Sequence, residues 1–138
     1  MTGPLTARRD ALVAELCDLA DDLRWDWLIE RARARPALPA AERTEAHRVP
    51  GCLSNLWVVP TFSDGRCHYR CDADSVVVKA VAGLLCDFYS DAPPAEILVL
   101  DPSFLRAAGV TAHLTSHRRN ALTKVWALIR DFAARHAG

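Results

Sequence analysis

The spacing of hydrophobic residues divides the chain into a helical first part, a strand-forming middle and a helical last part. From Arg9 to Leu23, leucines recur at every third or fourth position, which predicts one amphipathic helix. A second helical pattern follows, with an apolar face made of Trp25, Leu28, Ile29 and Ala32. Pro36 disfavours helical geometry at Arg35, so this helix is predicted to end there.

The middle part alternates in the manner of strands. Residues 36–46 are predicted to cross the surface as a linker. Leu53 to Phe62 is rich in β-branched and aromatic residues and ends at a turn signal, Ser63-Asp64-Gly65. From Arg66 to Asp72, apolar and polar residues alternate, which indicates a hairpin with one buried and one solvated face. His47 to Val49 is predicted to add a third short strand.

Helical periodicity returns at Ala73, where a broad apolar stripe is wide enough to cover a small sheet. Asp74 is expected in the first turn of this helix, where a negative charge suits the helix dipole. Two short helices should follow, and a last helix should begin near Thr115 or Ser116. These elements predict an α+β fold, with a small antiparallel sheet of about three strands and helices packed on one side, in a single domain over residues 1–138.

Composition removes several classes of function. The 138 residues carry 17 basic and 17 acidic side chains, so no basic stripe favours nucleic acid or a charged membrane surface. No apolar run approaches the length of a membrane span, and the first ten residues show no signal region. We therefore expect a cytoplasmic protein. Phosphate loops, dinucleotide fingerprints and paired catalytic carboxylates are absent from the sequence, and no cofactor is expected.

Cys52 is the candidate for chemistry. It follows a bend at Pro50-Gly51 and precedes a strand, in the run from Arg48 to Val59. A thiol reacts as a thiolate, and a turn with exposed N–H groups or a nearby cation lowers its pKa. The sequence contains no recognisable catalytic base for acyl transfer, so thiol exchange fits this cysteine better, although a packing role stays open on these grounds.

The other four cysteines allow one alternative. Cys67 and Cys71 face the same side of their predicted strand, and with Cys52 they could hold zinc or a cluster. No Cys-x-x-Cys pair supports such a scaffold. Cys17 and Cys86 lie in predicted helices and are expected to be packing residues.

A resemblance goes further. The run from Arg48 to Trp57 is similar to the cysteine-loop motif of the SufE family of sulfur-acceptor proteins, and the likeness covers about four fifths of the chain. Departures are Leu53 and Asn55 in place of glutamines, Ala80 and Ala121 in place of glycines, and Ser116-His117 in place of Pro-Ser; Cys67 and Cys71 are not family features. The matching segments are Leu38-Pro39, Arg43 to Glu45, Asp64 to Arg66, Asp72 to Ser75, Lys79, Ala82 to Leu85, Tyr89-Ser90, Pro94 to Leu98 and Leu114 to Leu122.

The resemblance implies an accessory protein and not an enzyme. Cys52 would take persulfide sulfur from a pyridoxal-phosphate-dependent, SufS-like cysteine desulfurase, stimulate that enzyme, and pass the sulfur to an iron–sulfur scaffold. No metal site is then expected. The residues expected to support the loop and the thiolate are Pro50, Gly51, Leu53, Ser54, Asp74 and Arg118.

Overall fold

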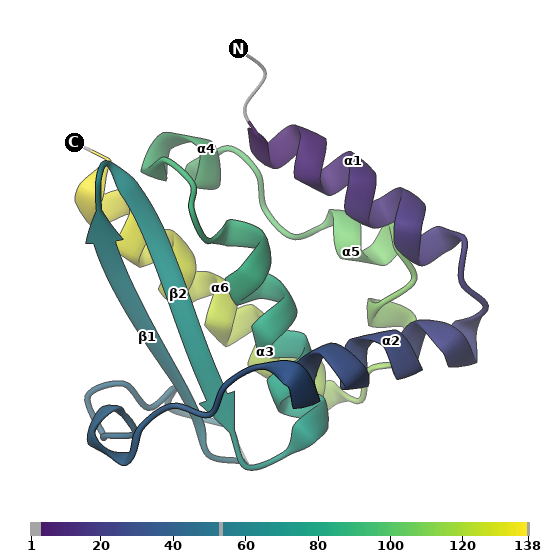
Figure 1. Ribbon diagram of the computed structural model, residues 1–138, viewed down its shortest axis with the longest axis horizontal. Helices are drawn as coiled ribbons and strands as arrows, with labels where there is room; N and C mark the ends of the chain where they lie inside the picture. The colour runs from purple at the N-terminus through teal and green to yellow at the C-terminus, as the bar shows by residue number, and fades with distance from the viewer. Residues whose placement is uncertain (1–3, 53, 138) are drawn as a thin grey trace.

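The helix α3 (Val76–Tyr89) lies in the middle of the molecule (Figure 1). It contacts β2 (Arg66–Ala73), α2 (Asp21–Ala34), α6 (Ser116–His136) and α1 (Pro4–Cys17). The computed structural model describes residues 4–52 and 54–137. α3 is apolar on most of its circumference, as a helix enclosed by other elements must be. Ser75 caps it by accepting a hydrogen bond from the Val78 N–H at 3.3 Å. Asp74 therefore precedes the cap and does not lie in the first helical turn as predicted.

The predicted hairpin is confirmed. β1 (Leu56–Ser63) and β2 (Arg66–Ala73) pair antiparallel, with Val58 opposite Cys71. Asp64 and Gly65 adopt φ angles of 55° and 75°, the left-handed geometry of a two-residue hairpin turn.

The predicted third strand is wrong, because the sheet in the described residues has two strands. The segment before β1 makes only a single bridge, between Arg48 and Trp57. This segment does not form a strand because the N–H groups of His47 and Arg48 donate to the carbonyl groups of Thr44 and Glu45. The backbone there is turned and cannot extend as a strand.

The prediction of one helix from Arg9 to Leu23 is also wrong. The chain forms α1 (Pro4–Cys17), breaks, and starts α2 at Asp21 (Asp21–Ala34). The buried Arg24 side chain explains the break, since its Nε and Nη2 atoms donate to the carbonyl groups of Leu16 and Leu19, each at 2.9 Å. These bonds satisfy carbonyl groups at the end of α1 that a helix end leaves free. The end of α2 before Pro36 is as predicted.

The helices α3 and α6 cover one face of the hairpin. α6 (Ser116–His136) contacts α3, α4 and β1, and its cap is Thr115, as predicted. The hydroxyl of the buried Tyr69 on β2 donates to the Ile129 carbonyl at 3.0 Å, which ties the hairpin to α6. The short elements are α4 (Pro94–Leu98), α5 (Phe104–Ala107) and two 3₁₀ turns, η1 (Ala40–Glu42) and η2 (Thr111–His113). The architecture is α+β.

The linker at residues 36–46 is held on this core by one buried carboxylate. Asp72 accepts hydrogen bonds from the N–H groups of Leu38 and Ala73, each at 2.9 Å. Lys79 neutralises it, with its Nζ atom 3.5 Å from Asp72 Oδ1. In the described part of the chain, no helix has the length and apolarity needed to cross a membrane.

Candidate functional site around Cys52

The loop that carries Cys52 is fixed at its base. The Val49 N–H donates to the Leu56 carbonyl at 2.8 Å, and the Val58 N–H donates to the His47 carbonyl at 2.9 Å. These two bonds hold the ends of the loop on β1. Cys52 lies between the two ends and is partly buried against the core.

The bend before Cys52 depends on Gly51, whose φ of +79° is rarely adopted by residues with a Cβ. The carbonyl group of Gly51 accepts a hydrogen bond from Asn120 Nδ2 at 3.2 Å, which connects the bend to α6. Lys124, one turn further along α6, lies over the bend, because a Cβ at position 51 would be 2.8 Å from its Cε atom. Gly51 therefore allows both the turn and the approach of a cation.

A chain of three side chains braces the far side of the loop. Arg48 Nε donates to Asn55 Oδ1 at 3.2 Å, and Asn55 Nδ2 donates to Asp74 Oδ2 at 2.8 Å. The Asp74 N–H in turn donates to the Asn55 carbonyl at 3.1 Å. The two side-chain bonds are exposed to solvent, so they orient the loop without burying it.

The Cys52 side chain borders a cavity of about 290 Å³ into which the starts of two helices open. Ser75 and Thr115, the caps of α3 and α6, both line it. A helix N-terminus carries partial positive charge, so two of them favour an anion in the cavity between. The remaining lining residues are Ser54, Val78, His117, Arg118 and Ala121.

Cys52 is half-buried, and its burial raises the pKa of the thiol above its ordinary value. Lys124 and Arg48 act in the opposite direction, because their positive charges favour the thiolate. Burial is the larger effect. The expectation of a lowered pKa is therefore not met in this loop position, and the thiol at rest is protonated at neutral pH.

The structure brings together only part of the predicted set. Cys52, Ser54 and Arg118 line one cavity, and Pro50 and Gly51 form the bend beside them. Asp74 reaches the loop through Asn55 and does not line the cavity. Leu53 lies outside the described residues.

Two supporting residues on α6, Asn120 and Lys124, were missed as site residues. Asn120 stood in a segment already matched to the family, so its role could have been considered. No sequence pattern indicates a role for Lys124, because only the fold places this residue of α6 over Gly51.

The other cysteines are separate from this site. Cys67, Cys71 and Cys86 are buried in the core, whereas Cys17 is exposed, contrary to prediction, with its Sγ atom 3.3 Å from the Ala107 carbonyl oxygen. Among residues 4–52 and 54–137, no group of three or more histidine, cysteine, aspartate or glutamate side chains is arranged to hold a metal. The zinc or cluster alternative thus finds no ligand set in the described residues.

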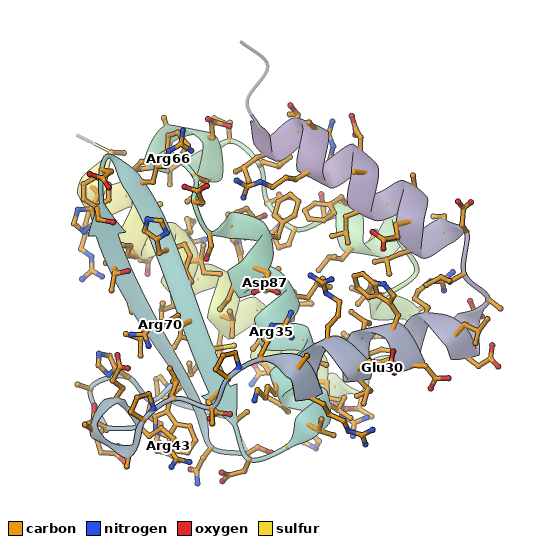
Figure 2. All side chains as sticks on the ribbon, in the orientation of Figure 1. Glu30, Arg35, Arg43, Arg66, Arg70 and Asp87 are labelled. Carbon is orange, nitrogen blue, oxygen red and sulfur yellow. The ribbon has the colours of Figure 1, made fainter. Side chains whose placement is uncertain are left out.

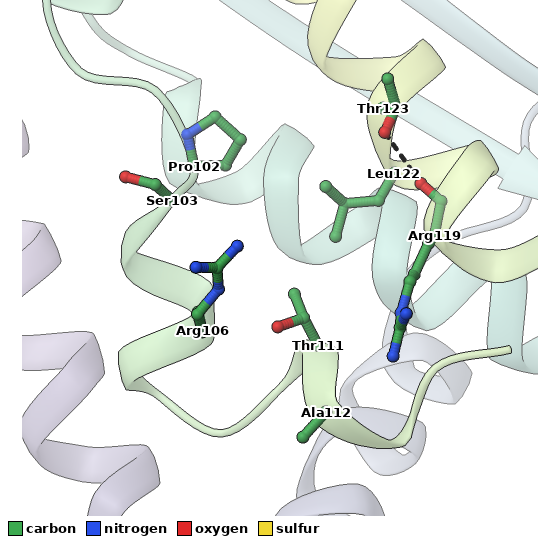
Figure 3. A pocket seen from close by; sticks show the side chains of 8 residues that line it. All are labelled: Pro102, Ser103, Arg106, Thr111, Ala112, Arg119, Leu122 and Thr123. Atoms are coloured by element: carbon green, nitrogen blue, oxygen red, sulfur yellow. Dashed lines mark hydrogen bonds between the residues drawn. The ribbon is translucent and has the colours of Figure 1, made fainter. Parts of the chain in front are cut away.

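A larger cavity of about 530 Å³ lies between α5, η2 and α6 (Figure 3). Arg119 lines it, whereas the preceding residue, Arg118, lines the cavity of Cys52. Arg106 enters from α5, and no cysteine is among the described residues that line it. The described residues that line this cavity provide positive charge but no thiol.

Comparison with known proteins identifies the family of this chain. The family model "Fe-S metabolism associated domain", SufE, matches residues 10–133. An uncharacterized SufE-like protein from Rhizobium etli is 29% identical over 134 residues, covering 92% of this chain and 90% of that protein. SufE-like protein 1, chloroplastic/mitochondrial, from Arabidopsis thaliana is 35% identical over 92 residues, covering 66% of this chain and 25% of that protein.

Two further matches extend the comparison. The chloroplastic quinolinate synthase of Oryza sativa is 36% identical over 107 residues, which are 77% of this chain but 15% of that protein. A solution structure of a hypothetical protein from Thermus thermophilus has the same fold, with a TM-score of 0.77, 23% identity, and coverage of 99% and 98% of the two chains. With a family model over nearly its whole length, the chain belongs to the SufE family, whose domain is associated with iron–sulfur metabolism.

Proposed function

We propose that this protein is a sulfur acceptor that takes persulfide sulfur from a cysteine desulfurase onto Cys52. It is an accessory protein, stimulates the desulfurase by removing its product sulfur, and delivers the sulfur for iron–sulfur cluster assembly. The partner is a pyridoxal-phosphate-dependent, SufS-like enzyme, the recipient is a cluster scaffold, and the site of action is the cytoplasm. Family membership and the geometry of the Cys52 loop support this proposal.

The transfer step requires only a thiolate, access and alignment. Cys52 Sγ, deprotonated, attacks the outer sulfur of the desulfurase persulfide and forms a new sulfur–sulfur bond. The bond between the two desulfurase sulfurs breaks, and the desulfurase cysteine leaves as a thiolate. Cys52 then carries the persulfide, and no external oxidant or reductant is consumed.

The observation that carries the proposal is the position of Cys52, which is half-buried in a loop held by solvent-exposed side-chain hydrogen bonds. Its raised pKa keeps the resting thiol unreactive toward other thiols and oxidants. Two backbone bonds hold the base of the loop, and the side-chain bonds beyond the base are exposed to solvent, so Cys52 can move toward a docked partner while β1 stays in place.

The free energy needed to move the loop is small. Outward movement breaks the Asn120–Gly51 bond and the two side-chain bonds of Asn55, all of them exposed to solvent. At roughly 1 kcal/mol each, these bonds amount to about 3 kcal/mol. A conformation at that free energy is populated at about 1% or less, which a partner can select.

Loading of Cys52 with sulfur favours its position in the cavity. A persulfide is a stronger acid than a thiol, so the loaded sulfur is anionic at neutral pH. The two helix N-termini and Arg118 then provide positive charge around it. In the described residues, the Arg118 guanidinium has no hydrogen bond or ion pair with another side chain, so it is available to the sulfur or to the partner.

The test is desulfurase turnover, followed as alanine production, with and without this protein. The parent should accelerate turnover, and Cys52→Ser should lose the acceleration. Cys17→Ser is the matched control, because it removes an exposed thiol that does not line the cavity and should accelerate turnover like the parent. Equal acceleration by Cys52→Ser and the parent would refute the proposal.

A further inference from the structure

A second pair of thiols lies in the core, away from Cys52. Cys71 is on the buried face of β2, and Cys86 is on α3, the helix that packs against that face. Their exposed fractions are 6% and 2%. Both line a cavity of about 150 Å³, and the segment from Arg35 to Leu38 forms another part of its wall.

The two thiols line the same cavity but differ in their electrostatic surroundings. The neighbouring Cys86 thiol is the main cause that lowers the pKa of Cys71, and Arg35 and Lys79 contribute positive charge there. The neighbouring Cys71 and complete burial raise the pKa of Cys86 well above its ordinary value. The surroundings thus favour the thiolate at Cys71 more than at Cys86.

Arg35 contributes an unpaired donor beside this pair. Its Nε and Nη2 atoms donate to Asp87 Oδ2 at 3.1 and 2.6 Å, and Figure 2 labels both residues. Its Nη1 atom is buried and has no hydrogen-bond partner among the described residues. The guanidinium lies against Gly83, where a Cβ would collide with Nη1. A buried N–H group without a partner is costly, and an anionic sulfur at Cys71 would satisfy it.

We propose that Cys71 and Cys86 form a second, redox-active thiol site, which a small peroxide oxidises to a disulfide between β2 and α3. The inference goes beyond sulfur transfer and does not depend on Cys52. It rests on two buried thiols in one cavity, beside a guanidinium whose Nη1 atom has no partner among the described residues.

The oxidation proceeds in two balanced steps with hydrogen peroxide as the oxidant. The Cys71 thiolate attacks one peroxide oxygen, the O–O bond breaks, and hydroxide leaves, so that Cys71 becomes a sulfenic acid. Cys86 then attacks the Cys71 sulfur and the S–O bond breaks, with the Cys86 proton and the departing hydroxyl forming water. In sum, two thiols and one peroxide give one disulfide and two waters.

The size of the cavity determines which reagents can reach the pair. Hydrogen peroxide is hardly larger than water and fits in about 150 Å³, whereas another protein's cysteine cannot approach a sulfur that is 6% exposed. Cys67 is equally buried on the same strand face but does not line this cavity. Cys67 is therefore the matched control.

The disulfide would link two elements that also build the Cys52 site. Ser75, the cap of α3, lines the cavity of Cys52, and β2 pairs with the strand that follows the loop. A bond between residues 71 and 86 constrains the unfolded chain and should raise the midpoint of thermal unfolding of the oxidised protein.

The test uses full-length protein carrying Cys52→Ser, so that its result is independent of the proposed function. The protein is treated with hydrogen peroxide, its free thiols are blocked under denaturing conditions, and its disulfides are reduced, labelled with a second reagent and mapped by mass spectrometry. We expect the second label on Cys71 and Cys86 together and the first label on Cys67. The unreduced digest should contain the cross-linked peptide, lighter by two hydrogen atoms than the sum of its parts.

Variants sharpen the outcome. Cys67→Ser should form the cross-link like the parent, Cys71→Ser should leave Cys86 as a free thiol, and Arg35→Gln should slow cross-linking several-fold. The inference is overturned if peroxide sufficient to oxidise the exposed Cys17 leaves Cys71 and Cys86 both free, or if Cys71 pairs instead with Cys67. The mapping of the parent alone decides these outcomes if Cys71→Ser fails to fold.

Discussion

Asn120 on the first turn of α6 donates a hydrogen bond from Nδ2 to the carbonyl oxygen of Gly51, at 3.2 Å, one residue before Cys52. This bond joins the last helix of the chain to the loop that carries the candidate sulfur acceptor, across 69 residues of sequence. The bond is exposed to solvent and therefore weak, so that the loop can open at a small cost in free energy.

Removing that bond should make Cys52 more accessible. Asn120→Ala should speed alkylation of Cys52 several-fold at neutral pH, since a bond of about 1 kcal/mol changes an opening equilibrium about fivefold. The rate is measured with iodoacetamide and peptide mass spectrometry. Thr123→Ala, which removes an exposed hydroxyl bond to the Arg119 carbonyl on the same helix, should leave the rate unchanged. A slower or equal rate in Asn120→Ala would contradict the role given to the bond.

Lys124 should set the pH dependence of Cys52. Alkylation follows the thiolate fraction, and the raised pKa places the midpoint of the rate profile above that of an ordinary thiol. Lys124 favours the thiolate, so Lys124→Gln should move the midpoint to still higher pH and slow the reaction at neutral pH. Arg130→Gln, an exposed residue on the same helix, is the control and should not move it. A midpoint shifted downward in Lys124→Gln would show that the sign is wrong.

Gly51 and Gly65 provide a matched pair for the bend. Both have φ angles near +80°, at +79° and +75°, so an alanine at either position should cost about 1–2 kcal/mol of unfolding free energy. Only at position 51 would the new Cβ displace Lys124, because nothing lies within 4 Å of the Cβ at position 65. Urea unfolding should therefore report similar losses, while only Gly51→Ala shifts the pH profile of Cys52 upward. Equal pH profiles in both variants would contradict the contact with Lys124.

Asp72 should be a main determinant of stability. Asp72→Asn leaves the largely buried Lys79 ammonium without its counter-charge, and breaking a buried pair costs about 3 kcal/mol or more. The measurement is the free energy of unfolding in urea. Asp10→Asn, at an exposed position, should change it by about 0.5 kcal/mol or less. A similarly small change in Asp72→Asn would mean that the linker is held by other contacts.

The hairpin, α3 and α6 could be predicted from sequence because their signals are local. Asp64-Gly65 has the backbone demands of a tight turn, and the apolar stripe after Ser75 has a helical period. The break between α1 and α2 could not be predicted, since it depends on Arg24 folding back onto the carbonyl groups of Leu16 and Leu19. Leucine periodicity continues across that break and conceals it.

The candidate site could likewise be predicted only in part from the sequence. Cys52 and its bend could be found from sequence, since Pro50 and Gly51 precede it directly. The cavity, the two converging helix starts and the Lys124 contact depend on the packing of α3 against α6, to which no short sequence pattern corresponds. The raised pKa of Cys52 could not be read from the sequence for the same reason, because burial is a property of the fold.

Sulfur acceptance by Cys52 can be tested by locating the transferred sulfur. The protein is incubated with a cysteine desulfurase and cysteine, its thiols and persulfides are alkylated, and each of the five cysteines is examined by mass spectrometry. We expect one additional sulfur atom on Cys52, with Cys17 and the three buried cysteines unmodified. Sulfur on Cys17, or none on Cys52 while the desulfurase turns over, would contradict this expectation.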